Sequence, residues 1–376
     1  MPRESFVRLS EVRTEDVGKR HGGDVWAVRN VSISVRPGEF YTVLGPPGAG
    51  KTSFLKMLAG LLRPDTGRIF VDDQLIDAVP PEERNVALVV SEGALWPHMS
   101  VFENVAFGLR VRSVAEDEVG RKVTAALALV GCSDRGERSP SELSVGDRQR
   151  VAWARALVVG PRLLLLDEPF AFLDPVERGR TRADLARLHR GLGTTTICAT
   201  RDQTAALALS TRIAVLAAGS LVQEAKPEDI YWRPRTRFVA EWVGAANLVP
   251  VRVVELREMG VVVEAAGGAR LPVAAGGHAW TIGAPALLCL RPEALQVEEA
   301  AVAPGGIPGT VTSQTFEGSR QMYEVDINEG RLRVEMITSA LLGRSFRPGD
   351  RVKVEVSPES SVLLPDEGNP RAMTVR

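Results

Sequence analysis

Short apolar stretches recur along the first two thirds of the chain and predict buried β-strands. The clearest of them are residues 40–44, 86–90, 163–166, 194–200 and 213–216. Between them, apolar side chains in residues 54–62, 115–131 and 147–158 follow each other at intervals of three or four, which predicts helices. Because strands alternate with helices, we expect a doubly wound α/β domain with a parallel sheet, whose ligands bind at the carboxyl ends of the strands.

The pattern changes at about residue 246, where many short apolar strands follow each other at close intervals. Glycine- and proline-rich turns at 267–268, 276–277 and 304–306 separate candidate strands such as 287–290 and 352–356. Such a pattern is typical of a small all-β barrel. It holds no recognisable catalytic cluster, so binding, regulation or dimerisation is its expected role. We therefore predict two domains, 1–245 and 246–376.

Composition and charge describe an ordinary globular protein. The 376 residues are 44% hydrophobic and 25% charged, with a formal net charge of −1. A broad nucleic-acid footprint would need a basic excess, so we expect no nucleic-acid partner. The three cysteines are far apart in sequence, which indicates reduced thiols in a cytosolic protein. We expect no secretory leader and no membrane span, because no apolar run approaches about 20 residues.

A glycine-rich turn between the strand at 40–44 and the helix that follows matches the phosphate-binding pattern G-x-x-x-x-G-K-[ST]. It consists of Gly45, Pro46, Pro47, Gly48, Ala49, Gly50, Lys51 and Thr52. Main-chain N–H groups from about Gly48 to Ser53 and the helix dipole would attract an anion. Lys51 adds a charge toward the β- and γ-phosphates, and the Thr52 hydroxyl can ligate Mg²⁺. The turn therefore predicts a site for ATP and Mg²⁺.

Two carboxylates follow the apolar strand at 163–166. Asp167 would stand at the carboxyl edge of the parallel sheet, where it can hold Mg²⁺. Glu168 can orient the attacking water or accept its proton. A pair of solvated carboxylates after a core strand is the structural alternative. Together with the glycine-rich turn, however, the pair predicts the second half of a nucleotide-hydrolysing site.

Several further motifs stand in an order that resembles one family. Residues 143–150 read LSVGDRQR, residues 169–174 read PFAFLD, residues 95–105 read LWPHMSVFENV, and residues 290–293 read LRPE. With the glycine-rich turn and the two carboxylates, they resemble the ATP-binding subunit of a bacterial ABC importer. The resemblance covers nearly the whole chain. It is to the maltose, polyamine and iron(III) type, which carries an oligonucleotide-fold-like regulatory domain at its C-terminal end.

The resemblance implies a head-to-tail dimer. Each ATP then lies between the glycine-rich turn of one subunit, its phosphate loop (residues 45–52), and the signature segment of the other subunit (residues 143–150). Ser144, Gly146 and Asp147 would be the signature residues near the nucleotide. Partners would be integral-membrane permeases, a second ATPase subunit and, indirectly, a solute-binding protein. The chain would then be peripheral, at the cytoplasmic face of the membrane. The ending of the chain resembles the polyamine and iron(III) type slightly more than the sugar type.

The chain departs from the family pattern at several site positions. Ser91 stands where a glutamine reaches Mg²⁺ and water, and Arg201 stands where a histidine contacts the γ-phosphate. Arginine only donates hydrogen bonds and stays charged, so it could hold a phosphate but accept no proton. In the signature, Val145 replaces a glycine and Asp147 a glutamine, adding branched bulk and a negative charge. His21 takes the place of the aromatic residue that stacks on adenine, with Trp26 as a less favoured substitute.

Two interpretations fit these departures. The chain either binds MgATP and hydrolyses it slowly, or Arg201 and a rearranged loop restore near-normal turnover. A hydrolysis-deficient partner or regulatory subunit is the main alternative to a working transport ATPase. A small-molecule kinase would lack the signature segment and would also lack residues 95–105, which resemble the family's segment that meets the permease; this chain has both. A soluble relative acting on ribosomes or DNA would usually carry two cassettes or a basic arm.

Overall fold

The computed structural model describes residues 9–91, 94–258, 260–300, 306–328, 330–341 and 345–366. The chain forms two compact units, Met1–Pro227 and Glu228–Arg376. This division lies before the boundary of 245/246 expected from the sequence, because the short helices α7 (Pro227–Trp232) and α8 (Arg237–Trp242) belong almost entirely to the second unit. The functional boundary at 245/246 stays a prediction.

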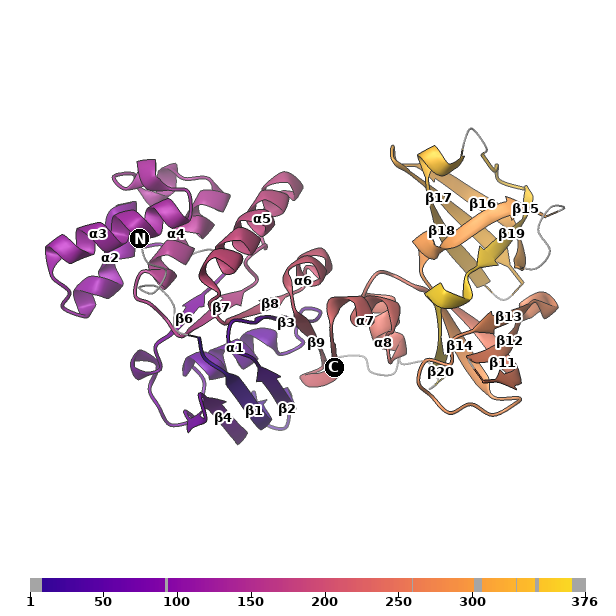
Figure 1. Ribbon diagram of the computed structural model, residues 1–376, viewed down its shortest axis with the longest axis horizontal. Coiled ribbons are helices and arrows are strands. Elements are labelled where there is room, and N and C mark those ends of the chain that lie inside the picture. Colours follow the sequence, from indigo (N-terminus) through magenta and orange to yellow (C-terminus); the bar gives the residue numbers. More distant parts are fainter. Residues whose placement is uncertain are drawn as a thin grey trace. The chain divides into compact units, whose positions relative to one another are not determined.

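Two sheets form the framework of the first unit (Figure 1). The larger has the order β10-β9-β3-β8-β7-β6, and all its neighbours run parallel except β10, which is antiparallel to β9. The smaller, antiparallel sheet has the order β2-β1-β4-β5. The strands are β1 (Val12–Arg20), β2 (Trp26–Val35), β3 (Phe40–Leu44), β4 (Thr66–Val71), β5 (Gln74–Leu75), β6 (Val86–Val89), β7 (Leu163–Asp167), β8 (Thr196–Thr200), β9 (Arg212–Ala217) and β10 (Ser220–Ala225).

The helices of this unit begin at recognisable caps. Ser100 and Glu103 form a reciprocal capping box at the start of α2, and the Asp174 side chain accepts two main-chain N–H bonds ahead of Pro175, the first residue of α5. The α-helices are α1 (Lys51–Ala59), α2 (Val101–Val111), α3 (Glu116–Leu129), α4 (Val145–Leu157), α5 (Pro175–Leu192) and α6 (Gln203–Leu209). Short 3₁₀ helices are η2 (Pro81–Glu83), η3 (Ser133–Arg135) and η4 (Pro140–Glu142).

The parallel sheet is buried on both faces, which explains its uninterrupted apolar strands. In β7, Leu164 and Leu166 pack into a core with α2, α3 and α4, whereas Leu163 and Leu165 pack into a second core with α1 and the antiparallel sheet. The predicted α/β class with a parallel core is confirmed. The carboxyl ends of β3, β7 and β8 lie next to each other, since these strands are neighbours in register.

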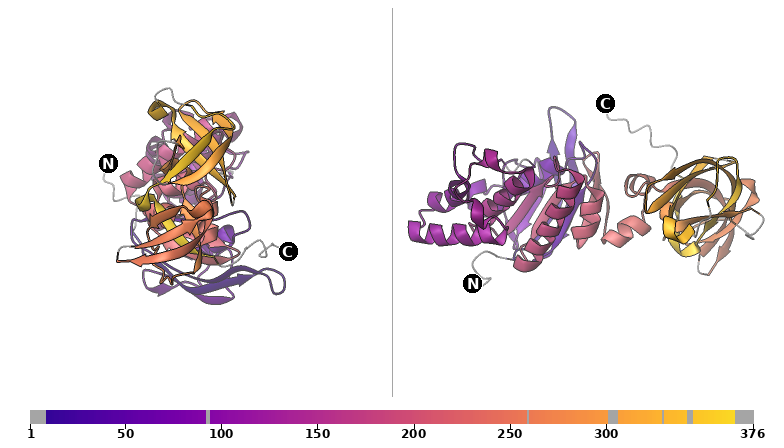
Figure 2. Two further views of the ribbon diagram at one scale, coloured as in Figure 1. Left: turned by 90° about the vertical axis from the view of Figure 1, so that its right-hand side faces the viewer. Right: turned by 90° about the horizontal axis from the view of Figure 1, so that it is seen from above.

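The second unit is all-β apart from short helical segments, as predicted (Figure 2). Two five-stranded antiparallel sheets, β13-β12-β11-β14-β20 and β15-β19-β16-β17-β18, share one hydrophobic core. The strands are β11 (Asn247–Arg257), β12 (Gly260–Ala265), β13 (Arg270–Val273), β14 (Pro285–Leu290), β15 (Leu295–Glu299), β16 (Ile307–Phe316), β17 (Arg320–Ile327), β18 (Gly330–Ile337), β19 (Arg351–Val356) and β20 (Ser361–Pro365). Its 3₁₀ helices are η5 (Ala266–Gly268), η6 (Pro292–Ala294), η7 (Thr338–Leu341) and η8 (Pro358–Ser360).

Buried Arg291 fixes the two short helices to the sheets of the second unit. Its guanidinium donates to the carbonyl oxygens of Tyr231, Ala240 and Val243. Arg291 is only 2% exposed, so these bonds replace the water that the charged group loses. Within the described ranges, none of the helices is both long enough and apolar enough to cross a membrane.

Candidate functional site

The glycine-rich turn links β3 to α1, and lack of space requires glycine at two of its positions. Gly50 has φ 92°, a left-handed conformation, and a side-chain carbon there would collide with the Ala27 carbonyl oxygen. A side-chain carbon on Gly45 would collide with the Leu216 carbonyl oxygen. Glycine at these two positions therefore lets the main chain of the turn pass close to the Ala27 and Leu216 carbonyl oxygens. Helix α1 begins directly after it, so its first N–H groups face the turn, as expected for an anion site.

Lys51 and Thr52 reach from the first turn of α1 toward the end of β7. Lys51 Nζ donates to the carbonyl oxygens of Gly45, at 2.8 Å, and Pro46, at 3.1 Å, and lies 3.3 Å from Glu168 Oε1. The Thr52 hydroxyl donates to Asp167 Oδ1 at 3.0 Å. The lysine is 6% exposed, so its charge acts in a partly desolvated site, where electrostatic interactions are stronger.

The two carboxylates at the end of β7 have different surroundings. Burial raises the pKa of Asp167 above its ordinary value, and the charge of Glu168 adds to this, while the hydrogen bond from Thr52 opposes it. Glu168 has φ 48°, a left-handed conformation that is uncommon outside glycine. Such backbone strain is often found at functional positions.

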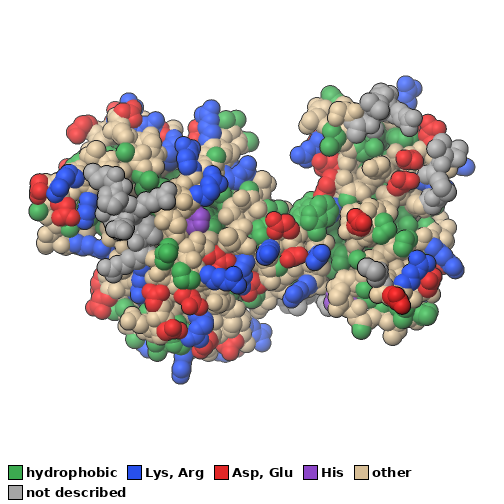
Figure 3. Space-filling model, viewed as in Figure 1, with side chains coloured by type: hydrophobic (Ala, Val, Ile, Leu, Met, Phe, Trp, Pro, Cys, Tyr) green, Lys and Arg blue, Asp and Glu red, His purple; other side chains and the backbone are tan. Residues whose placement is uncertain are grey.

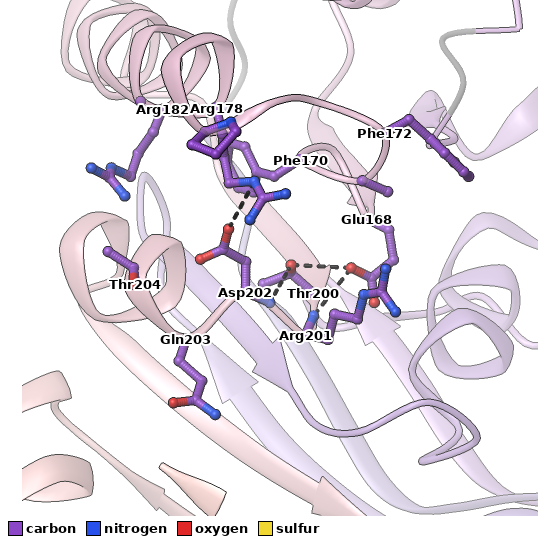
Figure 4. Close-up of a pocket in the computed structure, with 13 residues that line it drawn as sticks. Glu168, Phe170, Phe172, Arg178, Arg182, Thr200, Arg201, Asp202, Gln203 and Thr204 are labelled. Atoms are coloured by element: carbon purple, nitrogen blue, oxygen red, sulfur yellow. Dashed lines mark hydrogen bonds and ion pairs between the residues drawn. The ribbon is translucent and has the colours of Figure 1, made fainter. Parts of the chain in front are cut away.

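The end of β8 holds Glu168 from the other side (Figure 4). Glu168 Oε2 accepts a hydrogen bond from the Thr200 hydroxyl at 3.2 Å and one from the Arg201 main-chain N–H at 3.1 Å. Asp202 caps α6 by accepting from the Ala205 N–H at 2.8 Å. The carboxylate predicted to orient water is thus fixed by three donors, counting Lys51.

A cleft of about 590 Å³ opens beside Glu168. Glu168, Phe172, Arg178, Arg182, Arg201 and Asp202 are among the residues that line it (Figure 4). Arg178 donates to the Leu173 carbonyl oxygen at 3.0 Å and lies 3.7 Å from Asp202 Oδ2. It therefore connects the loop at 169–174 with the segment after β8, a connection that the sequence did not reveal.

His21 and Ser91, two of the predicted site residues, lie at the margins of this arrangement. The ring of exposed His21 lies 3.2 Å from the Ser53 hydroxyl, next to the phosphate loop. Trp26 is instead covered, since Arg20 stacks on its ring at 4.4 Å. Ser91 follows β6 and is partly buried. Among the residues whose placement is described, no hydrogen bond joins Ser91 to Thr52 or Asp167.

The signature segment forms the start of α4. The Ser144 hydroxyl caps the helix by accepting from the Asp147 N–H at 3.1 Å. Gly146 packs so tightly that a side-chain carbon would collide with Glu177 Oε2. Val145 remains 41% exposed.

The carboxylate of Asp147 points into the protein. Its two oxygens pair with Arg135 of η3 and with Arg150 of α4, and the side chain is 12% exposed. Burial acts to raise the pKa of Asp147, yet the hydrogen bonds from Arg135 and Arg150 hold it below its ordinary value. The carboxylate is therefore an ionised, paired group rather than an exposed negative charge.

The structure thus brings together Gly45–Ser53, Asp167, Glu168 and Arg201, whereas the signature residues lie elsewhere. Within the described ranges, no hydrogen bond or ion pair connects Ser144, Gly146 or Asp147 with residues 45–53. Their assignments as nucleotide ligands stay predictions. Sequence reasoning missed Arg135 and Arg178. A signal existed for Arg178, which follows a capping Asp174-Pro175 by one helical turn.

The oxygen ligands at the end of β7 fit Mg²⁺ chemically. Thr52 supplies a hydroxyl and Asp167 a carboxylate, both hard ligands, and they are already in contact. On the face of the first unit drawn in Figure 3, basic and acidic side chains are interspersed.

Comparisons with known proteins show which families this chain is similar to. Two family models match the chain, "ABC transporter" over residues 28–171 and "TOBE domain" over residues 288–364. The chain is 39% identical over 350 residues to the spermidine/putrescine import ATP-binding protein PotA of Methylococcus capsulatus, covering 93% of this chain and 91% of that protein. It is 39% identical over 326 residues to the Fe(3+) ions import ATP-binding protein FbpC of Brucella abortus, covering 87% and 90%.

Solved structures resemble the first unit in fold. The chain cbiO1 from Clostridium perfringens, part of the ABC transporter complex cbiONQ, superposes with a TM-score of 0.56 at 27% identity, covering 59% of this chain and 91% of that one. A dimeric, post-hydrolysis structure of the ATP-binding cassette MJ0796 with ADP and Pi superposes with a TM-score of 0.52 at 27% identity, covering 57% and 98%.

Proposed function

The chain belongs to the ATP-binding subunits of ABC importers, and on this premise we propose that it binds MgATP at a dimer interface and couples ATP hydrolysis to solute uptake. One observation carries the proposal. At the carboxyl edge of the parallel sheet, Thr52 contacts Asp167 while Lys51 pairs with Glu168. A phosphate-binding cation, two oxygen ligands for a metal and a positioned carboxylate therefore stand in one place.

Each of these residues has a distinct part in hydrolysis. Lys51 and the N–H groups at the start of α1 hold the β- and γ-phosphates. Thr52 and Asp167, with Ser91 as a further oxygen ligand, would hold Mg²⁺, which when bound neutralises phosphate charge. Glu168, fixed by Thr200 and the Arg201 N–H, orients the attacking water and accepts its proton. The Arg201 side chain holds phosphate oxygens by charge.

A dimer completes this site. The signature residues make no hydrogen bond or ion pair with their own chain's phosphate loop, so far as the described residues go, which fits a site completed by a second subunit. The MJ0796 cassette, dimeric with ADP and Pi, supports the same arrangement. The γ-phosphate bridges the two subunits, so its binding closes the dimer and its hydrolysis reopens it. The second subunit is another copy of this chain or a different ABC ATPase.

The closing and reopening of the dimer is transmitted to permease subunits in the membrane. The chain would lie at the cytoplasmic face of the membrane, bound to two permease subunits through residues 95–105, with an external solute-binding protein delivering the solute. The relatives named for spermidine/putrescine and Fe(3+) favour a polyamine or iron(III) over a sugar. Deleting the gene and measuring uptake of labelled spermidine, putrescine, Fe³⁺ and maltose tests this. Loss of maltose uptake alone would contradict the preference.

Hydrolysis is tested on the purified full chain with Mg²⁺ and ATP, alongside a nucleotide-binding titration. We expect turnover that the substitution Glu168→Gln abolishes while nucleotide binding is retained. Binding without turnover above this control would contradict the proposal. It would favour the alternative, a hydrolysis-deficient subunit paired with a standard ABC ATPase. Arg201 is the observation behind that alternative, because its side chain stands beside Glu168 where it accepts no proton.

A further inference from the structure

A network of five charged side chains lies beneath the signature segment, residues 143–150, at the start of α4. Asp147 pairs with Arg135 and Arg150, Arg150 pairs with Asp184 of α5 at 3.0 Å, and Asp184 also pairs with Arg187. Asp134 stands at the edge of the network, 3.7 Å from Arg135. Arg135 is thus the member that belongs to neither α4 nor α5, since it reaches Asp147 from η3.

Arg150 alone does not balance Asp147. Its guanidinium is shared between Asp147 and Asp184 and is 17% exposed. Arg135, whose side chain is 24% exposed, contributes a second cation, and with it both oxygens of Asp147 are occupied. Removing one partner of a buried ion pair leaves an uncompensated charge, which is costly and changes the local field.

We propose that Arg135 is a positioning residue for nucleotide binding, because it holds the Asp147 carboxylate inward and cancels its charge at the signature segment. The inference rests on the proposed function, in which this segment meets the partner's nucleotide. With Asp147 neutralised, the positive end of α4 faces the phosphates undiminished. Ser144 accepts the Asp147 N–H bond at its oxygen, so its hydroxyl proton can donate to a phosphate. Arg135 therefore compensates for an aspartate where the family pattern has a glutamine.

The test uses the full chain in the Glu168→Gln background, where the proposed function predicts that bound ATP is not hydrolysed. Sedimentation gives the MgATP concentration at half-maximal dimer formation. We expect Arg135→Gln to raise this concentration about tenfold, since the unbalanced Asp147 charge would repel the phosphates through a partly buried medium. Added salt should reduce the difference, because it screens repulsion but does not repair packing. The double variant Arg135→Gln/Asp147→Asn should return to the reference value.

Arg187→Gln is the matched control. Its side chain is 74% exposed and touches the network only at Asp184, so dimer formation should be unchanged. A salt-independent defect, or a double variant as impaired as Arg135→Gln, would overturn the inference. Binding of fluorescent ATP by the dilute monomer distinguishes a failure of the proposed function from a failure of the inference about Arg135. Lost binding in the reference chain overturns the proposed function, whereas intact binding and dimers insensitive to Arg135 overturn only the inference.

Discussion

Lys51 Nζ lies 3.3 Å from Glu168 Oε1, which joins the phosphate loop directly to the carboxylate at the end of β7. Each partner is also held by neighbours, Lys51 by the Gly45 and Pro46 carbonyl oxygens and Glu168 by Thr200 and the Arg201 N–H. The pair therefore aligns the cation proposed to bind phosphate with the group proposed to position water. Such preorganisation is usually the largest single contribution to an enzyme's rate.

Replacing Lys51 should lower the affinity for MgATP strongly and the stability of the fold less. Lys51→Met removes the phosphate-binding charge and also frees Glu168 from its ion pair. We expect MgATP affinity to fall by about 10- to 100-fold, the range for a lost charge-assisted hydrogen bond. A fluorescent-ATP titration measures this, with Lys122→Met as control, since Lys122 pairs with Glu118 on the same helix, α3, and has no other ion pair among the described residues. Equal affinities for the two variants would show that the phosphate loop is not the nucleotide site.

Restoring the family residues should raise turnover. In the double variant Ser91→Gln/Arg201→His, a longer amide can reach metal and water, and an imidazole can donate or accept beside Glu168. We expect kcat to rise about 100-fold, the reverse of losing one positioned group. Arg182→His, at another position lining the same cleft, controls for the change of arginine to histidine. An unchanged kcat would mean that Ser91 and Arg201 are tolerated substitutions.

The fold was predictable where the apolar pattern is uninterrupted. Strands β3, β6, β7 and β9 lie where the sequence indicated them, because both faces of a parallel sheet are buried and leave a continuous apolar run. Helix α5 was not predicted from its pattern. Only Thr181, Leu185 and Leu188 are buried along its 18 residues, so its buried stripe is narrow and contains only two apolar side chains.

The candidate site was predictable only in part, for a similar reason. Lys51, Thr52, Asp167 and Glu168 belong to local motifs that follow strands, and the parallel register brings those strand ends together. The partnership of Arg135 with Asp147 depends on how η3 packs against α4. No local spacing encodes that contact, so sequence reasoning placed the Asp147 charge beside the phosphates, whereas the structure turns it inward.

The partly buried carboxylate of Asp167 should lower the stability of the folded chain at neutral pH. The pKa of Asp167 is raised by burial, so the folded state holds its proton more tightly than the unfolded state does, and stability falls as the pH rises through the folded pKa. Asp167→Asn should therefore raise Tm by about 2–4 °C at neutral pH, and this gain should vanish below about pH 4. The variant should also lose the stabilisation that MgATP gives. A gain that persists in acid would indicate improved packing rather than charge.

Loss of Arg291 should release the two short helices from the sheets of the second unit. Arg291→Met leaves the carbonyl oxygens of Tyr231, Ala240 and Val243 without their donor, and we expect about 3–5 kcal/mol of destabilisation in urea unfolding. Hydrogen exchange over residues 229–243 should accelerate, because Arg291 holds main-chain carbonyl oxygens of both α7 and α8. Arg252→Met, which removes one exposed bond to Gly283, should change neither measurement. Unchanged exchange in Arg291→Met would mean that apolar contacts alone fix these helices.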